Sequence, residues 1–205
     1  MENVLDVYKR PYDKNYPVLC MDESPKQLIE EMQSLPMKPG YEKYVDYEYI
    51  RTGVVNIFMA SEPLNGQRTI EVTEHKTKKD WAAFIKKLAD VLYPTAKKIT
   101  LVMDNYITHS ASSLYESFEP EEAKRLWDRF EFIYTPKHGS WLNMAEIELQ
   151  VLNNQCLKRH IAKIETVKSE IEAWLYCKNS QVKKINWQFT NKEARIKLKR
   201  LYPSL

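Results

Sequence analysis

Two aspartates stand out because each ends an apolar stretch. Asp22 ends the run LCMD, and Asp104 ends the run LVMD. Functional groups in α/β proteins gather where strands end, so these two side chains are candidates for one site. The plainer alternative is that each aspartate only caps a turn, which is a common role for aspartate at a strand end.

A glutamate could complete the set from a helix predicted to begin near Leu142. Glu146 and Glu148 lie about 200° apart around the helix axis, so they cannot both reach one site. Each flanks the apolar stripe on a different side, so helical phase does not choose between them, and either could be a solvated residue. Three converging carboxylates would repel one another unless cations neutralised them. Ligand sets made only of oxygen favour Mg²⁺ or Mn²⁺ over zinc.

The elements that must position these carboxylates follow from the apolar periodicity. Strands are predicted at 18–24, 47–63, 67–75, 98–105 and 130–136, with a hairpin turn at Asn65–Gly66. Helices are predicted from Thr77 as N-cap to Pro94, at 112–118, from Pro120 to Phe130, at about 142–159 and at 166–178. Tight connections make the first three strands antiparallel, and helical crossovers bring in the last two. This order predicts an α/β protein with a ribonuclease H-like fold, a mixed five-stranded sheet with helices on both faces.

Composition narrows the class of protein. The 205 residues suit a single domain spanning 1–205, and 31 basic against 28 acidic residues leave a net charge of only +3. The three cysteines show no CxxC spacing, which favours reduced thiols over disulfides or a zinc site. No run of 18 apolar residues and no secretory signal is present, so a cytoplasmic protein without a membrane span is expected.

Three segments together resemble a known family. MDES, MDNYITH and TPKHGSWLNMAEIEL are similar to the motifs of DDE-type transposases, in the bacterial insertion-sequence branch of the mariner-like superfamily. The resemblance spans nearly the whole chain and implies that Asp22, Asp104 and Glu146 are catalytic and bind two Mg²⁺ or Mn²⁺ ions. It leaves Glu148 as a solvated neighbour. The implied activity is DNA cleavage and strand transfer at insertion-sequence ends, by a homodimer or larger assembly on DNA associated with the bacterial nucleoid.

Two features depart from the family pattern. Residues 105–145, 41 in all, separate the last two carboxylates, more than in compact relatives, and the excess fits the helix predicted from Pro120. The helix-turn-helix DNA-recognition region expected upstream is also missing, because Met1 falls just before the first strand. A separate DNA-recognition polypeptide is therefore a possible partner.

Further residues are expected to support the site or contact DNA, and each has a plainer alternative. The supporting set is Asn105, His109 and Asn143. Asn105 could instead be a turn residue, and His109 could orient a carboxylate, contact a phosphate or pack locally. Ser140 is also a natural N-cap. Trp141 could stack on a base, but a position in the core is the favoured expectation. The segment EARIKLKR could be an ordinary surface helix. The candidate DNA-binding set is Lys137, His138, Ser140, Trp141, Arg195, Lys197 and Arg200.

Two other functions fit the same residues. The chain could be a ribonuclease H-like nuclease with another substrate, or a catalytically silent, DNA-binding remnant of a transposase. The SWLNMAE segment argues against the first alternative, and the presence of all three carboxylates argues against the second.

Overall fold

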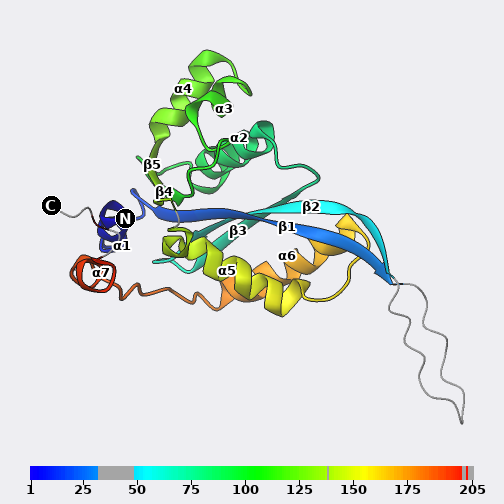
Figure 1. Ribbon diagram of the computed structural model, residues 1–205. Helices are drawn as coiled ribbons and strands as arrows, with labels where there is room; N and C mark the ends of the chain where they lie inside the picture. Colours follow the sequence, from blue (N-terminus) through cyan, green and yellow to red (C-terminus); the bar gives the residue numbers. More distant parts are fainter. Residues whose placement is uncertain (32–48, 138, 200–201, 203–205) are drawn as a thin grey trace, which may run out of the picture.

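The computed structural model describes residues 1–31, 49–137, 139–199 and 202. Within these residues, five strands form one sheet in the order β3-β2-β1-β4-β5 (Figure 1). Their bounds are β1 (Val18–Glu31), β2 (Tyr49–Glu62), β3 (Gln67–Thr73), β4 (Ile99–Met103) and β5 (Phe130–Tyr134). The pairs β1–β2 and β2–β3 are antiparallel, while β1–β4 and β4–β5 are parallel. The predicted mixed sheet and its strand directions are therefore confirmed.

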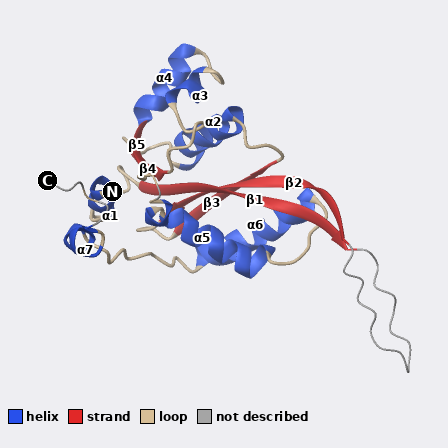
Figure 2. Cartoon of the chain, viewed as in Figure 1, coloured by secondary structure: helices blue, strands red, loops and turns tan. Residues whose placement is uncertain are grey.

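Helices cover both faces of the sheet, as predicted (Figures 1 and 2). One face carries α2 (Lys78–Lys87), α3 (Ala111–Tyr115) and α4 (Pro120–Arg129), and the other carries α5 (Met144–Leu152) and α6 (Ile164–Ser180). Two short helices, α1 (Glu2–Tyr8) and α7 (Asn191–Lys197), lie beside each other at one end. The periodicity did not predict α1, and α7 includes part of the segment EARIKLKR, for which a surface helix was one alternative. No helix in the described ranges is long and apolar enough to cross a membrane.

Two predicted helix starts are confirmed, and one predicted helix end needs correction. Thr77 caps α2 in a reciprocal capping box with Asp80, and Pro120 occupies the first turn of α4. The α-helical part of α2 ends at Lys87, where a π-helical turn over Leu88–Leu92 takes over, so Pro94 follows the helix without directly ending it.

The central strand is much longer than predicted. β1 extends to Glu31 because its polar second half pairs with β2 along its whole length. Its pairing with β4 covers only Val18 to Cys20, so the rest of β1 has a sheet neighbour on one side only. Pro25, which lacks an N–H, is tolerated in that half-paired stretch. The prediction that β1 ends near Asp22 is wrong, and Asp22 lies inside the strand.

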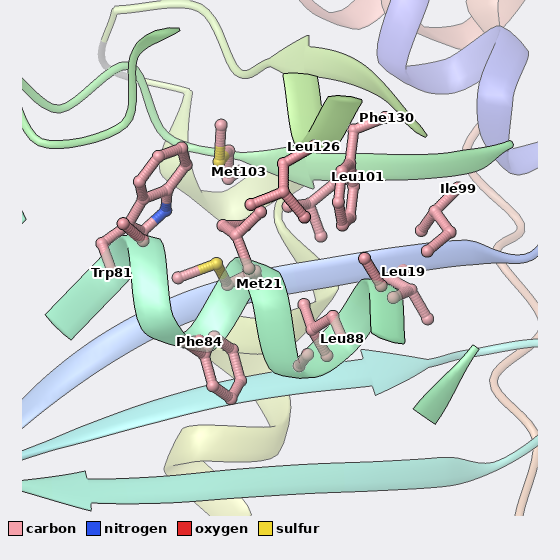
Figure 3. Packing of buried hydrophobic residues seen from close by; sticks show 14 of the residues in the cluster. Leu19, Met21, Trp81, Phe84, Leu88, Ile99, Leu101, Met103, Leu126 and Phe130 are labelled. Atoms are coloured by element: carbon pink, nitrogen blue, oxygen red, sulfur yellow. The ribbon is translucent and has the colours of Figure 1, made fainter. Parts of the chain in front are cut away.

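On one face of the sheet, apolar side chains of β1 and β4 pack against α2. Met21, Met103 and Trp81 are fully buried, and they lie together in the cluster that also receives Phe84 and Leu126 (Figure 3). Because strand side chains alternate, the residues between them on β1 and β4 face the opposite layer, which contains α5. The two aspartates belong to that alternate set.

Candidate active site

Asp22 and Asp104 lie side by side in register. Cys20 pairs with Val102 across β1 and β4, and each aspartate follows its paired residue by two positions. β4 ends at Met103, so Asp104 is the first residue after the strand, as predicted. Both aspartates therefore lie near the point where β4 leaves the sheet and β1 continues alone.

The third carboxylate is placed by the start of α5. Asn143 is the N-cap: its Oδ1 accepts a hydrogen bond from the Ala145 N–H at 3.1 Å, and its Nδ2 donates to the main-chain oxygen of Met21 at 2.7 Å. This buried side chain ties the first turn of α5 to β1, next to Asp22. The expectation that Ser140 caps the helix is wrong, because Ser140–Leu142 forms a separate 3₁₀ turn before it.

One pocket of about 380 Å³ brings the three carboxylates together. Asp22 and Asp104 contribute from the sheet and Glu146, which is exposed, from the first turn of α5. The other lining residues are Glu23, Ser24, Ser140, Asn143, Leu149, Gln150 and Asn153. The residues of the predicted metal set therefore share one surface of the molecule.

Glu148 is not the solvated neighbour that the resemblance implied. Its side chain is only 6% exposed and receives two hydrogen bonds from Arg68, at 2.6 and 2.7 Å. Arg68 also donates to the main-chain oxygen of Gly66 at 2.8 Å. Because this side of α5 is buried, Glu146 rather than Glu148 lines the pocket.

The pocket is short of positive charge around Asp22. Burial raises the pKa of the Asp22 carboxyl to about 6, and the negative charges of Asp104, Glu23 and Glu146 add to the rise. The opposing influence is the Glu23 main-chain N–H, which donates to Oδ1 of Asp22 at 2.8 Å. A cation in this pocket would relieve both the burial cost and the repulsion.

Asp104 has a different environment because His109 stands behind it. Nδ1 of His109 lies 2.7 Å from Oδ1 of Asp104 and 3.1 Å from the Asp104 main-chain oxygen. His109 lowers the pKa of the Asp104 carboxyl. Burial by itself would lower the pKa of His109, but its contacts with Asp104 and Glu23 outweigh burial and raise it to about 9. His109 was expected to orient a carboxylate, contact a phosphate or pack locally, and the structure places it in a buried position in contact with the Asp104 carboxylate.

The donor chemistry of the pocket fits a hard divalent cation. The groups that could bind one are the carboxylates of Asp22, Asp104 and Glu146, which are the oxygen ligands Mg²⁺ and Mn²⁺ prefer. Oδ1 of Asp104 is buried without a well-aligned hydrogen bond. Among the described residues, no three His, Cys, Asp or Glu side chains lie close enough together to bind one metal ion without rearrangement. The carboxylates are spread across the pocket.

The remaining predicted residues near the pocket differ in position. Ser140 lines it, whereas Lys137 and Asn105 are exposed and are not among its lining residues. Trp141 was expected in the core, but it is 42% exposed. Its ring centroid lies 5.8 Å from that of Phe189, which packs against the core. His138 lies outside the described residues.

The basic residues of α7 are not part of this pocket. Arg195 makes two 2.8 Å hydrogen bonds to Glu2 of α1, and Lys197 lies 3.5 Å from Glu193. EARIKLKR thus contributes to a short helix whose Ala194 is buried against α1, closer to the surface-helix alternative. Arg200 is outside the part of the chain that the structure describes.

Sequence reasoning missed three residues that shape the site, Glu23, Lys76 and Arg68. Strand alternation, applied to a longer β1, would have placed Glu23 on the face opposite Asp22. Lys76 and Arg68 gave no local signal, because their partners, Glu23 and Glu148, are 53 and 80 positions away in the chain.

Comparison with known families gives one match. Residues 17–168 match the model of a family described as DDE superfamily endonuclease, which includes all three carboxylates of the pocket. A search of curated proteins finds no match.

Solved structures share the fold. The Mos1 mariner paired end complex with Mn aligns with a TM-score of 0.62 and 15% identity over 89% of this chain. The Mos1 Strand Transfer Complex aligns with a TM-score of 0.60 and 13% identity, again over 89%. The mariner Mos1 paired end complex with Mg aligns with a TM-score of 0.59 and 14% identity over 88%. This chain spans 54 to 55% of those chains, about half their length.

Proposed function

This chain belongs to the DDE superfamily of endonucleases, and on that premise we propose that it is a transposase catalytic domain. The observation that carries the proposal is the single pocket shared by Asp22, Asp104 and Glu146. The substrate would be DNA, cut at the ends of a mobile element and then joined to a target. The mariner-like fold supports this choice, and the bacterial insertion-sequence branch remains part of the proposal.

The three carboxylates would hold two divalent ions, Mg²⁺ or Mn²⁺. Such ions supply activation of an attacking oxygen and stabilisation of the leaving oxygen in phosphodiester cleavage. Asp22 and Asp104 would bind from a rigid sheet, and Glu146 from a helix tied to that sheet through Asn143. His109 would hold the Asp104 carboxylate in place through its Nδ1, 2.7 Å from Oδ1.

DNA would approach over the segment that precedes α5. Ser140 lines the pocket, and the exposed Lys137 and Trp141 flank it in the sequence. A lysine can neutralise a phosphate, and an exposed tryptophan can stack on an unpaired base. Asn105, next to Asp104, and the α7 residues Arg195 and Lys197 are further proposed contacts. Arg195 would have to exchange its Glu2 partner for a phosphate.

We propose that the working form is a homodimer or larger assembly on DNA. The similar Mos1 structures are paired-end and strand-transfer complexes, and this chain corresponds to about half of each of their chains. Recognition of the mobile-element ends would then come from a region beyond the aligned part or from a separate polypeptide.

The test is metal-dependent nicking of supercoiled plasmid DNA. Wild-type protein should nick with Mn²⁺ or Mg²⁺ and lose the activity with EDTA, and Asp104→Asn should reduce the rate at least 100-fold. Asp128→Asn is the matched control, because Asp128 is an exposed aspartate paired with Lys124 on α4; this variant should remain active.

Equal cleavage by wild type and Asp104→Asn would refute the site. Preference for RNA–DNA hybrids over duplex DNA would favour a different nuclease, and no cleavage with metal would favour a silent remnant.

A further inference from the structure

Glu23 follows Asp22 in β1 but projects to the other face of the sheet. Strand side chains alternate, and the neighbours of these residues show which face each one takes. Met21 packs in the cluster of Trp81 and α2, whereas Cys20 packs in the cluster of Met144 and α5. Glu23 therefore belongs to the α2 side, and Asp22 to the α5 side with Glu146.

The Glu23 side chain is almost completely buried and has two cationic partners. It is 1% exposed; its Oε1 lies 2.7 Å from Nε2 of His109, and its Oε2 lies 2.9 Å from Nζ of Lys76. Burying a carboxylate costs several kcal/mol unless it is paired, and here both oxygens of Glu23 have a cationic partner. Lys76 is itself held over the ring of Tyr106, with Nζ 4.3 Å from the ring centroid.

His109 lies between Glu23 and Asp104 and contacts both. Its ring is fully buried, and its two nitrogens face the two carboxylates, Nε2 toward Glu23 and Nδ1 toward Asp104. The Trp81 ring lies 5.6 Å from the imidazole, and the Tyr134 hydroxyl donates to the His109 main-chain oxygen at 2.8 Å. Because the imidazole is enclosed on these sides, its orientation depends on the carboxylate at each nitrogen.

We propose that Glu23 is a positioning residue that fixes both aspartates of the pocket. Its main-chain N–H holds Oδ1 of Asp22 at 2.8 Å, and its side chain holds His109, which in turn faces Oδ1 of Asp104. Glu23 thus contacts Asp22 directly and Asp104 through His109. The inference rests on the proposed function, because it assigns Glu23 a role toward the metal ions expected in that pocket.

Such an arrangement would matter for affinity. Groups that orient metal ligands from behind are usually worth 10- to 100-fold in metal affinity, because a ligand that is already oriented loses less freedom on binding. From one position on β1, Glu23 contacts Asp22 with its main-chain N–H and acts on Asp104 with its side chain, through His109. Among the described residues that line the pocket, Glu23 is the one that contacts both Asp22 and the His109 beside Asp104.

Glu23→Gln tests only the contact of the Glu23 side chain with His109, because the hydrogen bond from the Glu23 main-chain N–H to Asp22 is unchanged. Mn²⁺ affinity of the full chain would be measured by titration with electron paramagnetic resonance detection of free Mn²⁺, without DNA. We expect Glu23→Gln to weaken Mn²⁺ binding about 10-fold or more. Glu62→Gln is the matched control: Glu62 is also buried, on the neighbouring strand β2, with Asn65 and Tyr93 as partners, and should bind Mn²⁺ like wild type.

A double-mutant cycle distinguishes an effect of Glu23 that acts through His109 from an independent effect on the fold. If Glu23 acts through His109, adding Glu23→Gln to His109→Gln should weaken Mn²⁺ binding little further, whereas independent effects would multiply. The ring ¹⁵N shifts of His109 should also change in Glu23→Gln and remain unchanged in Glu62→Gln. If Glu23→Gln does not fold, Glu23→Asp, which keeps the charge but shortens the reach, should show the same loss of Mn²⁺ affinity.

Two results would overturn the inference. One is Mn²⁺ binding by a folded Glu23→Gln or Glu23→Asp protein within twofold of wild type, and the other is full multiplication of the two effects in the cycle. Either would leave the proposed function intact, provided wild type binds Mn²⁺ and cleaves DNA. Failure of wild type itself to bind Mn²⁺ would instead remove the proposed function, and with it this role of Glu23.

Discussion

At the scale of single residues, the pocket places Asp22 in an environment that opposes its charge. Burial is the largest cause, and the neighbouring acidic side chains add to it, so the pKa of Asp22 rises from 3.8 to about 6. A carboxyl with a raised pKa in the folded protein favours its protonated form. The stability it contributes is therefore fully present below about pH 4 and is lost as the pH rises to about 6. The difference corresponds to about 3 kcal/mol at neutral pH.

The first prediction is that Asp22→Asn stabilises the metal-free protein. At pH 7.5 the amide carries no charge to bury or repel, so the free energy of unfolding should rise by up to about 3 kcal/mol. Urea unfolding at pH 7.5 and at pH 4.5 measures this, and the gain should shrink at the lower pH. A variant no more stable than wild type at pH 7.5 would contradict the electrostatic account.

The same variant should lose the response to metal. Saturating Mn²⁺ stabilises any protein that binds it only in the folded state, so wild type should melt at a higher temperature with Mn²⁺ than without. Asp22→Asn should melt at about the same temperature in both conditions. An equal Mn²⁺-dependent rise for both proteins would place the metal elsewhere.

The candidate site was predictable from sequence only as far as local pattern reaches. The positions of Asp22 and Asp104 after apolar runs indicated that they meet, and they do line one pocket. The choice of Glu146 over Glu148 came from resemblance, and the physical reason for it, the buried Arg68 pair, joins residues 80 positions apart. Pairings over such distances leave no trace in periodicity or spacing.

At the scale of elements, α5 is held on two sides. Asn143 ties the first turn of α5 to β1, and Glu148, on the buried side of α5, pairs with Arg68 on β3. Arg68 also accepts and donates main-chain hydrogen bonds with the Asn179 side chain at the end of α6. These contacts set the rotation of α5, so that Glu146 points to the pocket.

The second prediction concerns this ion pair. Glu148→Gln should destabilise the fold by about 3–5 kcal/mol, because it leaves the Arg68 charge buried without its partner. The double variant Arg68→Met with Glu148→Leu should recover most of that loss, since apolar side chains of similar size carry no charge to desolvate. Urea unfolding of Arg68→Met, Glu148→Leu and the double variant completes the cycle and measures the coupling energy.

An exposed pair provides the control for this cycle. Arg159 and Glu170 are 58% and 40% exposed, and Glu170→Gln should cost less than about 1 kcal/mol. A loss of that small size for Glu148→Gln as well would mean that Arg68 and Glu148 do not fix the helix.

The order of elements was predictable because it depends on short-range signals. The Thr77 capping box, Pro120 and the Asn65–Gly66 turn all mark real boundaries. The full length of β1 was not predictable, since its polar half is held in extended form by pairing with β2 rather than by its own pattern. The short helix α1 was missed for a similar reason: it is stabilised by packing on the core.

At the scale of the whole molecule, the charge distribution matters more than the net charge of +3. Several basic side chains are already paired within the protein, as Arg195 is with Glu2 and Arg68 with Glu148. Contacts with DNA would therefore depend on the exposed lysines that lie near the pocket, of which Lys137 is the nearest in sequence to Ser140.

The last prediction is that this chain binds duplex DNA with little sequence preference and with a steep dependence on salt. Each phosphate contact adds about −0.9 to the slope of log K against log salt concentration. Lys137→Ala should weaken binding to all sequences alike and reduce the slope by about 1, because one phosphate contact is lost. Lys124→Ala is the control, as Lys124 lies on α4 over the opposite face and is paired with Asp128. Fluorescence anisotropy with two unrelated duplexes over 50–300 mM salt would measure both quantities. Tight, salt-tolerant binding to one duplex only would show that the chain itself reads sequence, and a separate recognition region would then be unnecessary.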